Sequence, residues 1–219
     1  MADRNPTTLY IAGDSTVQTY GADRAPQAGW GQFIAEYFTD DLRFVNRAIG
    51  GRSSRTFIEE GRLEAILNEI KENDYLLVQM GHNDSTVSKP ERYTEPYGAY
   101  KQYLKMYIEG ARLRKSNPIL FTPVGRLHYE DGAFINDFPD YCHAMKQVAG
   151  ELEVPIVDLM ARSLEQYTQL GYERATRLFM ISSNGTDCTH ITEEGAKCIA
   201  NLVSQGIREL NLPISRYVK

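Results

Sequence analysis

The chain has 219 residues, of which 42% are hydrophobic and 24% are charged. This composition is typical of a globular protein with one substantial core, so we expect a single domain over residues 1–219. The formal net charge of −5 argues against nucleic acid as a partner, because binding phosphates requires a basic surface. No apolar run approaches the roughly 20 residues that a membrane helix needs, so we expect no membrane partner either.

The first residues of the chain and its cysteines indicate the cellular compartment in which we expect the protein. Residues 1–6 contain no apolar signal region, which predicts a cytoplasmic protein or one whose leader has been removed. Cys142, Cys188 and Cys198 are odd in number and form no CxxC pair. We therefore expect free thiols, which suit a reducing compartment. The oligomeric state is left open by these features.

Strand-like and helix-like segments alternate along the chain. The predicted strands are short and mostly apolar, and they cover residues 8–12, 43–46, 75–79, 119–121 and 156–158. The predicted helices cover residues 29–38, 56–72, 96–115, 136–151 and 192–210. The second of them could be broken at Gly61. A turn-rich stretch, residues 127–137, is predicted to be a long surface loop. The alternation predicts parallel strands joined by helical crossovers, with helices on both faces of one sheet.

Glycine and polar residues follow four of the predicted strands. They form four short segments: Gly13-Asp14-Ser15, Gly50-Gly51-Arg52-Ser53-Ser54, Gly81-His82-Asn83-Asp84 and Gly125-Arg126. Ligands of open parallel sheets bind beyond the carboxyl ends of the strands. The sequence therefore predicts a functional site at this edge of the sheet.

Ser15 is the candidate nucleophile of that site. A serine hydroxyl is weak until a base removes its proton, and a position directly after a strand could place it on a tight turn. A turn or helix-cap serine is the alternative. In Asp187-Cys188-Thr189-His190, the carboxylate precedes the imidazole by three residues, so it can face the ring and stabilise an imidazolium. We predict Ser15, His190 and Asp187 as a catalytic triad.

Other histidines compete for the role of base. His143 lies in a predicted helix, and we expect it to be structural. His128 lies in the predicted loop and could touch substrate. His82 has Asp84 nearby, but a metal site there would lack third and fourth ligands in the neighbouring sequence, so we expect no metal.

Three groups are candidate donors to a developing oxyanion: the Asn83 amide, the Gly51 N–H and the N–H of Ser15 itself. A well-placed donor of this kind stabilises a transition state by about 3 kcal/mol. Glycine at position 51 permits a close approach of backbone to ligand. The alternative is that these glycines only form tight turns.

Signatures of other functions are missing from the sequence. There is no GxSxG motif, which disfavours an ordinary α/β-hydrolase. There is no Walker A or GxGxxG motif, so nucleotide binding has no support. Cys188 lies beside the predicted acid, but a thiol nucleophile would need its own base, and we expect it to pack.

The chain resembles the SGNH, or GDSL-like, hydrolases in four blocks that occur in the family's order. The blocks are Gly13-Asp14-Ser15, Asn46-Arg47-Ala48-Ile49-Gly50-Gly51, Gly81-His82-Asn83-Asp84 and Asp187-Cys188-Thr189-His190. The resemblance implies Ser15 as nucleophile, Gly51 and Asn83 as oxyanion donors and His190 as base. It also implies a three-layer α/β/α sandwich with a five-stranded parallel sheet, which is the flavodoxin-like SGNH hydrolase fold. No metal or organic cofactor is implied.

Within this family the chain is most similar to the bacterial type of rhamnogalacturonan acetylesterase. The similarity lies in Thr16 after Gly-Asp-Ser, in Gly29-Trp30-Gly31, and in Gly51-Arg52-Ser53-Ser54-Arg55-Thr56-Phe57. It implies that acetyl groups are removed from galacturonic acid residues of acetylated pectic oligosaccharides. An acidic substrate calls for positive groups in the cleft, and the candidates are His82, Arg52, Arg55 and Arg126. The arginines could equally form structural ion pairs.

Two other functions stay open. One is an esterase of the same family that acts on another acetylated glycan, such as xylan, or on small acyl esters. A lipid substrate is disfavoured because the sequence has no apolar run that resembles a lid. The other is a carbohydrate-binding protein without catalysis, against which the complete set of predicted catalytic residues argues.

Overall fold

A parallel sheet of five strands forms the centre of the computed structural model, which describes residues 6–219. In spatial order the strands are β3 (Leu42–Asn46), β1 (Thr7–Gly13), β4 (Tyr75–Gln79), β5 (Asn117–Phe121) and β8 (Ile156–Val157). Numbered along the chain, this is the order 2-1-3-4-5 of flavodoxin-like sheets. The predicted α/β class and five-stranded parallel sheet are confirmed.

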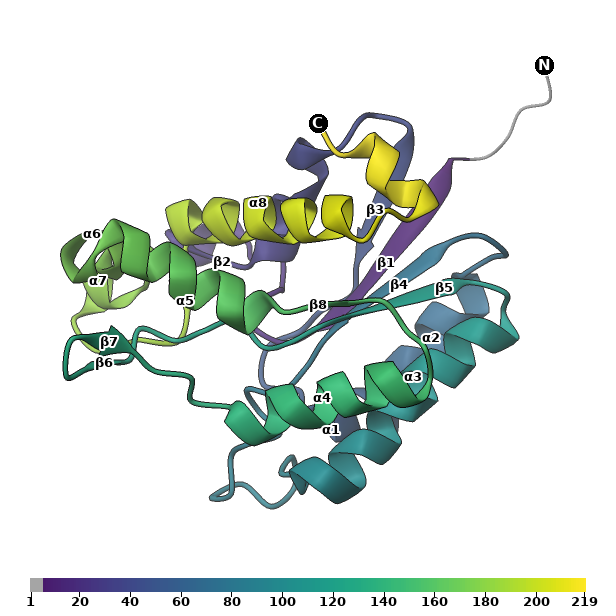
Figure 1. Ribbon diagram of the computed structural model, residues 1–219, viewed down its shortest axis with the longest axis horizontal. Coiled ribbons are helices and arrows are strands. Elements are labelled where there is room, and N and C mark those ends of the chain that lie inside the picture. The colour runs from purple at the N-terminus through teal and green to yellow at the C-terminus, as the bar shows by residue number, and fades with distance from the viewer. Residues whose placement is uncertain (1–5) are drawn as a thin grey trace.

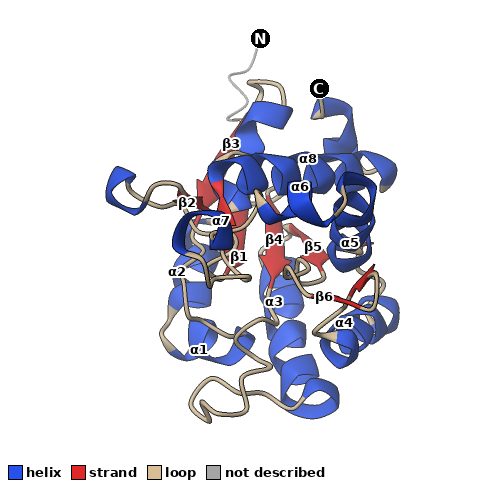
Figure 2. Cartoon of the chain, turned by 90° about the vertical axis from the view of Figure 1, so that its left-hand side faces the viewer, coloured by secondary structure: helices blue, strands red, loops and turns tan. Residues whose placement is uncertain are grey.

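Helices cover both faces of this sheet, so the molecule has three layers (Figures 1 and 2). One layer contains α1 (Ser54–Glu59), α2 (Arg62–Glu69), α3 (Lys101–Leu113) and α4 (Pro139–Glu151). The other contains α5 (Leu159–Leu170) and α8 (Glu193–Glu209). Successive side chains of a strand point to opposite faces of the sheet. The side chains of β1 therefore contribute to two hydrophobic cores, one on each face. Leu9 and Ile11 pack with α8, whereas Tyr10 and Ala12 pack with α1 to α4.

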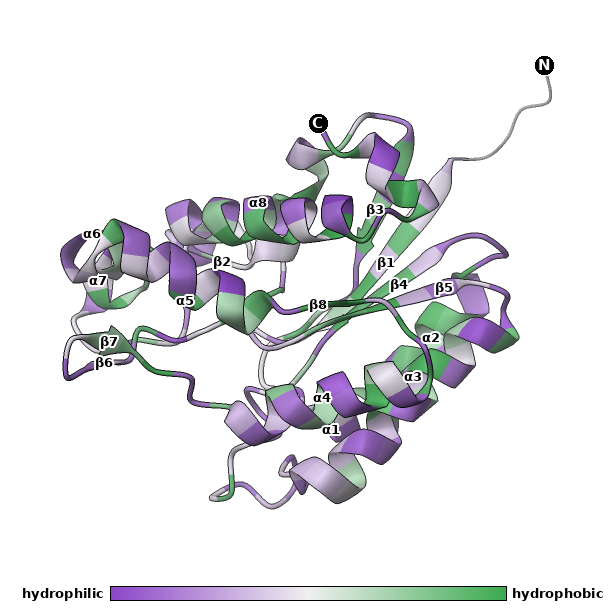
Figure 3. Ribbon diagram, in the orientation of Figure 1, coloured by the Kyte–Doolittle hydropathy of each residue, from purple (hydrophilic) through white to green (hydrophobic). Residues whose placement is uncertain are grey.

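The hydropathy of the elements follows these layers (Figure 3). The central strands are largely apolar, because a sheet covered on both faces exposes neither side to water. The surface helices alternate between apolar and polar residues, as amphipathic helices do. Among residues 6–219, no helix is both long and apolar enough to cross a membrane.

The register of the strands brings the functional segments to one edge. Gly13 at the end of β1 pairs with Gln79 of β4, and Gln79 pairs in turn with Phe121 of β5. Asn46 at the end of β3 pairs with Ile11. The polar segments that follow these strands therefore all begin at the same edge of the sheet.

The predicted helix at residues 29–38 is wrong. The segment forms the short strand β2 (Gln27–Ala28) and two 3-10 helices, η2 (Trp30–Gln32) and η3 (Ile34–Tyr37). The segment is in close contact with the turn that follows β1, to which two of its amides donate. Trp30 N–H donates to the Thr16 carbonyl at 3.0 Å, and Gly31 N–H donates to the Val17 carbonyl at 3.2 Å. Within the segment, the amide hydrogen bonds span three residues, as in a 3-10 helix, and not four.

Other predicted elements differ in their bounds. The predicted helix at residues 56–72 is two helices, because Gly61 adopts a left-handed conformation (φ 72°) between α1 and α2. The helix predicted from residue 96 begins with a π-helical turn, η4 (Pro96–Tyr100), before α3. The helix predicted from residue 136 begins at Pro139. The last helix is capped by Thr192, whose hydroxyl accepts from the Gly195 N–H at 3.2 Å.

The sequence analysis missed the elements between β8 and the last helix, and one hairpin. The missed elements are α5, α6 (Tyr172–Thr176), α7 (Ile181–Asn184) and β9 (Ile191–Thr192), which pairs with β2. The predicted loop at residues 127–137 contains a hairpin of β6 (Tyr129–Glu130) and β7 (Ala133–Phe134). Except for α5, these elements have two to five residues, too few for a clear periodic signal.

Candidate active site

Ser15 lies on a tight turn directly after β1. The N–H groups of Val17 and Gln18 both donate to the Asp14 carbonyl, at 3.1 and 3.0 Å, and this closes the turn around Ser15. Gly13 is required here, since a Cβ atom at that position would lie 2.7 Å from a methyl group of Val17. The turn leaves the Ser15 side chain partly exposed at the edge of the sheet.

The structure brings Ser15, His190 and Asp187 together from opposite ends of the chain. Ser15 Oγ lies 3.0 Å from His190 Nε2, and His190 Nδ1 lies 2.7 Å from Asp187 Oδ2. Oδ1 of Asp187 accepts the N–H groups of Thr189 and His190, both at 2.9 Å. These bonds fix the carboxylate and the imidazole in one orientation, as a serine nucleophile with a general base requires.

Asp187 is ionised at neutral pH in this arrangement. Burial acts to raise its pKa, but the N–H groups of His190 and Thr189 and the His190 ring more than offset this effect. The pKa of Asp187 is therefore lowered from its ordinary value. A carboxylate held in this form can stabilise an imidazolium on the neighbouring ring.

The loop after β3 lies against the nucleophile. A Cβ atom at Gly50 would lie 3.3 Å from Ser15 Cβ, and the Gly50 N–H donates to Gln18 Oε1 at 2.5 Å. Gly51 has φ 80°, a conformation that favours glycine, and within residues 6–219 its N–H has no hydrogen-bond partner. The same holds for the N–H of Ser15 in the described part of the chain. Ser15 itself and the loop that lies against it thus each offer a backbone N–H without a partner.

Arg52 connects the two predicted oxyanion loops. Its Nη1 donates to the Gly50 carbonyl at 2.8 Å, and that carbonyl belongs to the peptide group whose N–H is contributed by Gly51. Its Nε pairs with Glu60 at 3.0 Å. Its own carbonyl accepts from Asn83 Nδ2 at 3.0 Å, which leaves the second amide hydrogen of Asn83 available. The guanidinium thus bonds to the protein through Nε and Nη1, and its expected contact with substrate stays a prediction.

Asp84 holds the same two loops together from inside. It is fully buried and accepts from the Ser54 hydroxyl at 2.5 Å, the Ser54 N–H at 3.0 Å and the Thr94 hydroxyl at 2.8 Å. Burial, together with the nearby charge of Asp14, outweighs these donors and raises the pKa of Asp84 to about 6. The sequence analysis considered Asp84 only as a metal ligand and missed this role.

His82 is buried, which corrects the prediction that it lines the substrate cleft. Only 4% of its surface is exposed. Its Nδ1 lies 3.2 Å from Asp14 Oδ2, and its Nε2 lies 2.9 Å from the Val124 carbonyl. Both ring nitrogens are thus occupied by the protein.

The remaining arginines differ in their surroundings. Arg55 pairs with Glu59 at 2.8 Å in an exposed i,i+4 pair on α1. Arg126 lines a pocket together with Asp187. Arg92, which the sequence analysis missed, has its Nη1 3.4 Å from the Gly51 carbonyl. It lies in an irregular loop, where no periodic pattern could have indicated it.

The other residues considered from the sequence lie outside the triad. His128 Nδ1 pairs with Asp137 at 2.7 Å, and His143 lies on α4. Cys188 packs against the core beneath α8, and all three cysteines are free thiols, as predicted. In the described part of the chain, no group of three or more histidine, cysteine or acidic residues could hold a metal ion.

Comparison with known proteins places the chain among esterases and acylhydrolases. Residues 9–203 match the family described as GDSL-like Lipase/Acylhydrolase. The chain is 57% identical to the probable rhamnogalacturonan acetylesterase YesY of Bacillus subtilis (strain 168), over 96% of each chain. It is 39% identical to the rhamnogalacturonan acetylesterase RhgT of the same organism, over 98% of this chain and 95% of the relative.

Two solved structures are similar to this fold. The Bacillus subtilis protein YxiM superposes with a TM-score of 0.85 at 30% identity, over 95% of this chain and 58% of that one. The acetylxylan esterase Axe2 of Geobacillus stearothermophilus superposes with a TM-score of 0.69 at 17% identity, over 100% of this chain and 99% of that one. At that identity the second likeness concerns the fold alone.

Proposed function

Because the chain belongs to the GDSL-like lipase/acylhydrolase family, which is the SGNH hydrolase family expected from its sequence, we propose that it removes acetyl groups from rhamnogalacturonan oligosaccharides. It is a carboxylic ester hydrolase of the serine type. The proposed substrate is supported by the 57% identity, over nearly all of both chains, to a probable rhamnogalacturonan acetylesterase.

The first half of the reaction uses the Ser15–His190 contact. Ser15 Oγ attacks the acetyl carbonyl carbon while His190 Nε2, at 3.0 Å, takes its proton. The π electrons of the carbonyl move to its oxygen and form a tetrahedral oxyanion. Asp187 stabilises the imidazolium and keeps its Nδ1 proton in place. When the oxyanion collapses, the bond to the sugar oxygen breaks and His190 returns the proton to that oxygen.

The oxyanion is held by the N–H groups of Ser15 and Gly51 and by the Asn83 amide. This assignment is supported by the absence of other partners for the two N–H groups within residues 6–219 and by the free hydrogen of the amide. Removing one such donor typically slows catalysis by about 10²- to 10³-fold.

The second half releases acetate. Water takes the place of the sugar, His190 removes one of its protons, and the resulting hydroxide attacks the acetyl-Ser15 ester. The same donors hold the second oxyanion. Collapse gives acetate, and His190 returns the proton to Ser15 Oγ.

The test is acetate release by the native chain and by Ser15→Ala from three substrates: acetylated rhamnogalacturonan oligosaccharides, acetylated xylo-oligosaccharides and 4-nitrophenyl acetate. We expect the first to be the preferred glycan, and we expect Ser15→Ala to lose at least about 10³-fold of kcat on every substrate. Ser88→Ala, an exposed serine on the loop before η4, is the control and keeps full activity. Equal rates for Ser15→Ala and the native chain would contradict the assignment of Ser15 as nucleophile. A preference for the xylo-oligosaccharides would contradict the proposed substrate.

A further inference from the structure

A cavity of about 450 Å³ opens beside the loop that carries His190. One wall is formed by residues 126–129 and Asp137, the other by residues 186–189, and Tyr172 of α6 also lines it. The Leu127 N–H donates to the Cys188 carbonyl at 2.9 Å and joins the two walls. The volume falls in the range of about 300–1,000 Å³ typical of small-molecule sites. Because Asp187 belongs to both the triad and the wall, a ligand here lies next to the reacting groups.

Arg126 contributes an unpaired positive charge to this cavity, whose two lining carboxylates, Asp137 and Asp187, each face a histidine. In the described part of the chain, its guanidinium forms no ion pair and no hydrogen bond, and it lies 4.7 Å from the centre of the Phe138 ring. Arg52 and Arg55, in contrast, each pair with a glutamate. In a protein with a net charge of −5, an unpaired guanidinium that lines a cavity favours an anionic ligand. A carboxylate matches it best, because the planar fork binds both oxygens at once.

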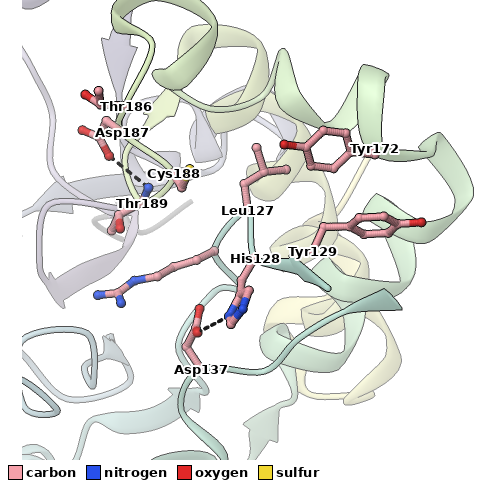
Figure 4. A pocket seen from close by; sticks show the side chains of 10 residues that line it. Leu127, His128, Tyr129, Asp137, Tyr172, Thr186, Asp187, Cys188 and Thr189 are labelled. Carbon is pink, nitrogen blue, oxygen red and sulfur yellow. Dashed lines mark hydrogen bonds and ion pairs between the residues drawn. The ribbon is translucent and has the colours of Figure 1, made fainter. Parts of the chain in front are cut away.

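Two tyrosine rings, which we call the tyrosine platform, border the cavity. Tyr129 and Tyr172 are 43% and 45% exposed, and their ring centres lie 5.1 Å apart at an angle of 35°. Figure 4 shows the two side chains next to each other on one side of the pocket, with Asp187 and Thr189 on the other.

The tyrosine platform is anchored from behind. Phe134 meets Tyr129 at 4.8 Å edge-on, and Phe134 meets the fully buried Tyr167 at 5.6 Å. The platform is therefore the outer end of an aromatic row that begins in the core. Exposed aromatic rings in a fixed orientation offer an apolar face with a polar tip, which suits a ligand that is apolar on one face and hydroxylated at its rim.

We propose that the tyrosine platform and Arg126 form a subsite for a second uronic acid unit of the oligosaccharide whose acetyl group reaches Ser15. Because the two tyrosine rings partly cover each other, the sugar packs on the outer face of the platform, and its carboxylate pairs with Arg126. This inference rests on the proposed function, because it requires an acidic oligosaccharide that extends from Ser15 into the cavity. The subsite makes affinity depend on the length and charge of the substrate, while the chemistry at Ser15 stays the same.

The experiment compares KM and kcat for acetylated rhamnogalacturonan oligosaccharides with those for 4-nitrophenyl acetate, which is too small to reach the subsite. The variants are Tyr129→Ala, Tyr172→Ala and Arg126→Gln. For each, we expect KM for the oligosaccharide to rise about three- to tenfold, in line with the strength of a single aromatic contact. The rate on 4-nitrophenyl acetate stays unchanged, which also shows that the variants fold. Tyr97→Ala is the matched control, since Tyr97 is 47% exposed and does not line the cavity.

A binding measurement separates failure of the subsite from failure of the proposed function. Calorimetry follows the binding of deacetylated rhamnogalacturonan oligosaccharides to Ser15→Ala and to Ser15→Ala combined with Tyr172→Ala. Native activity on the acetylated oligosaccharide with unchanged KM in both tyrosine variants would overturn the subsite alone. Binding that depends on Tyr172, without acetate release by the native chain, would overturn the proposed function alone. A native chain that neither binds nor deacetylates these oligosaccharides would overturn both.

Discussion

At the scale of single residues, Arg52 lies where it can orient an oxyanion donor. Its guanidinium binds the carbonyl side of the Gly50–Gly51 peptide group, and the other side of that group presents the Gly51 N–H. A charged donor on a carbonyl polarises the whole peptide group and strengthens the N–H as a donor. The pair with Glu60 holds the guanidinium in place. In the proposed mechanism, Arg52 is therefore a positioning residue that acts through Gly51.

Replacing Arg52 tests this role against substrate binding. We expect Arg52→Gln to lower kcat on 4-nitrophenyl acetate by about tenfold, a fraction of the loss of a whole oxyanion donor, with little change in KM. Arg55→Gln, which breaks only an exposed pair with Glu59, serves as the control and keeps its activity. If Arg52 bound the substrate carboxylate instead, the neutral ester would be unaffected and KM for the acidic oligosaccharide would rise.

At the scale of elements, His82 ties together the turns that follow three strands. Asp14 follows β1, His82 follows β4, and the Val124 carbonyl follows β5. Asp14 is fully buried, and burial alone would raise its pKa. His82 and the two Thr16 donors reverse this effect and lower the pKa of Asp14. The residue next to the nucleophile is thus held by a buried polar network.

Removing His82 leaves buried groups without partners. We expect His82→Phe to lower the free energy of unfolding by about 1–3 kcal/mol, the usual cost of an unsatisfied buried polar group. Urea denaturation measures this loss. His143→Phe, on α4, is the control and changes stability little. If His82→Phe has the free energy of unfolding of the native chain and a raised KM for the oligosaccharide, His82 contacts substrate, and the structural role argued here is wrong.

At the scale of the whole molecule, Asp84 makes stability depend on pH. Its folded pKa of about 6 lies above the ordinary value of 3.8, so the folded state holds this proton more tightly than the unfolded chain does. The contribution of Asp84 is therefore fully present below pH 3.8 and is lost as the pH rises through about 6. Above that pH, the folded protein carries a buried carboxylate that burial and Asp14 disfavour.

The comparison with Asp84→Asn isolates this effect, because the amide does not titrate. Between pH 4 and pH 8, we expect the free energy of unfolding of the native chain to fall relative to the variant by on the order of 3 kcal/mol. Denaturant titrations of both proteins at several pH values measure the difference. A difference that stays constant with pH would contradict the assignment, even if the variant is less stable throughout.

The sequence by itself determined the class of the fold and supplied the three residues of the proposed triad. Short apolar runs separated by helical periods require buried parallel strands, and the segments after those strands then share one edge. Ser15 and the Asp187–His190 spacing could be recognised because their short motifs, each weak alone, occur with two others in the order of a known family. The family of the chain followed from four such motifs in order.

Only the tertiary structure decided what the charged and aromatic side chains around the triad do. Arg52 and His82 were expected in the cleft, but the Arg52 guanidinium bonds to the Gly50 carbonyl, and His82 is buried against Asp14, 68 residues away in the sequence. The segment at residues 29–38 packs against the turn after β1 and forms two 3-10 helices instead of one regular helix. Tyr129 and Tyr172, 43 residues apart, meet only because a hairpin and a short helix pack together. Such contacts depend on which polar and aromatic groups from distant parts of the sequence come together in the fold. Local sequence patterns do not contain that information.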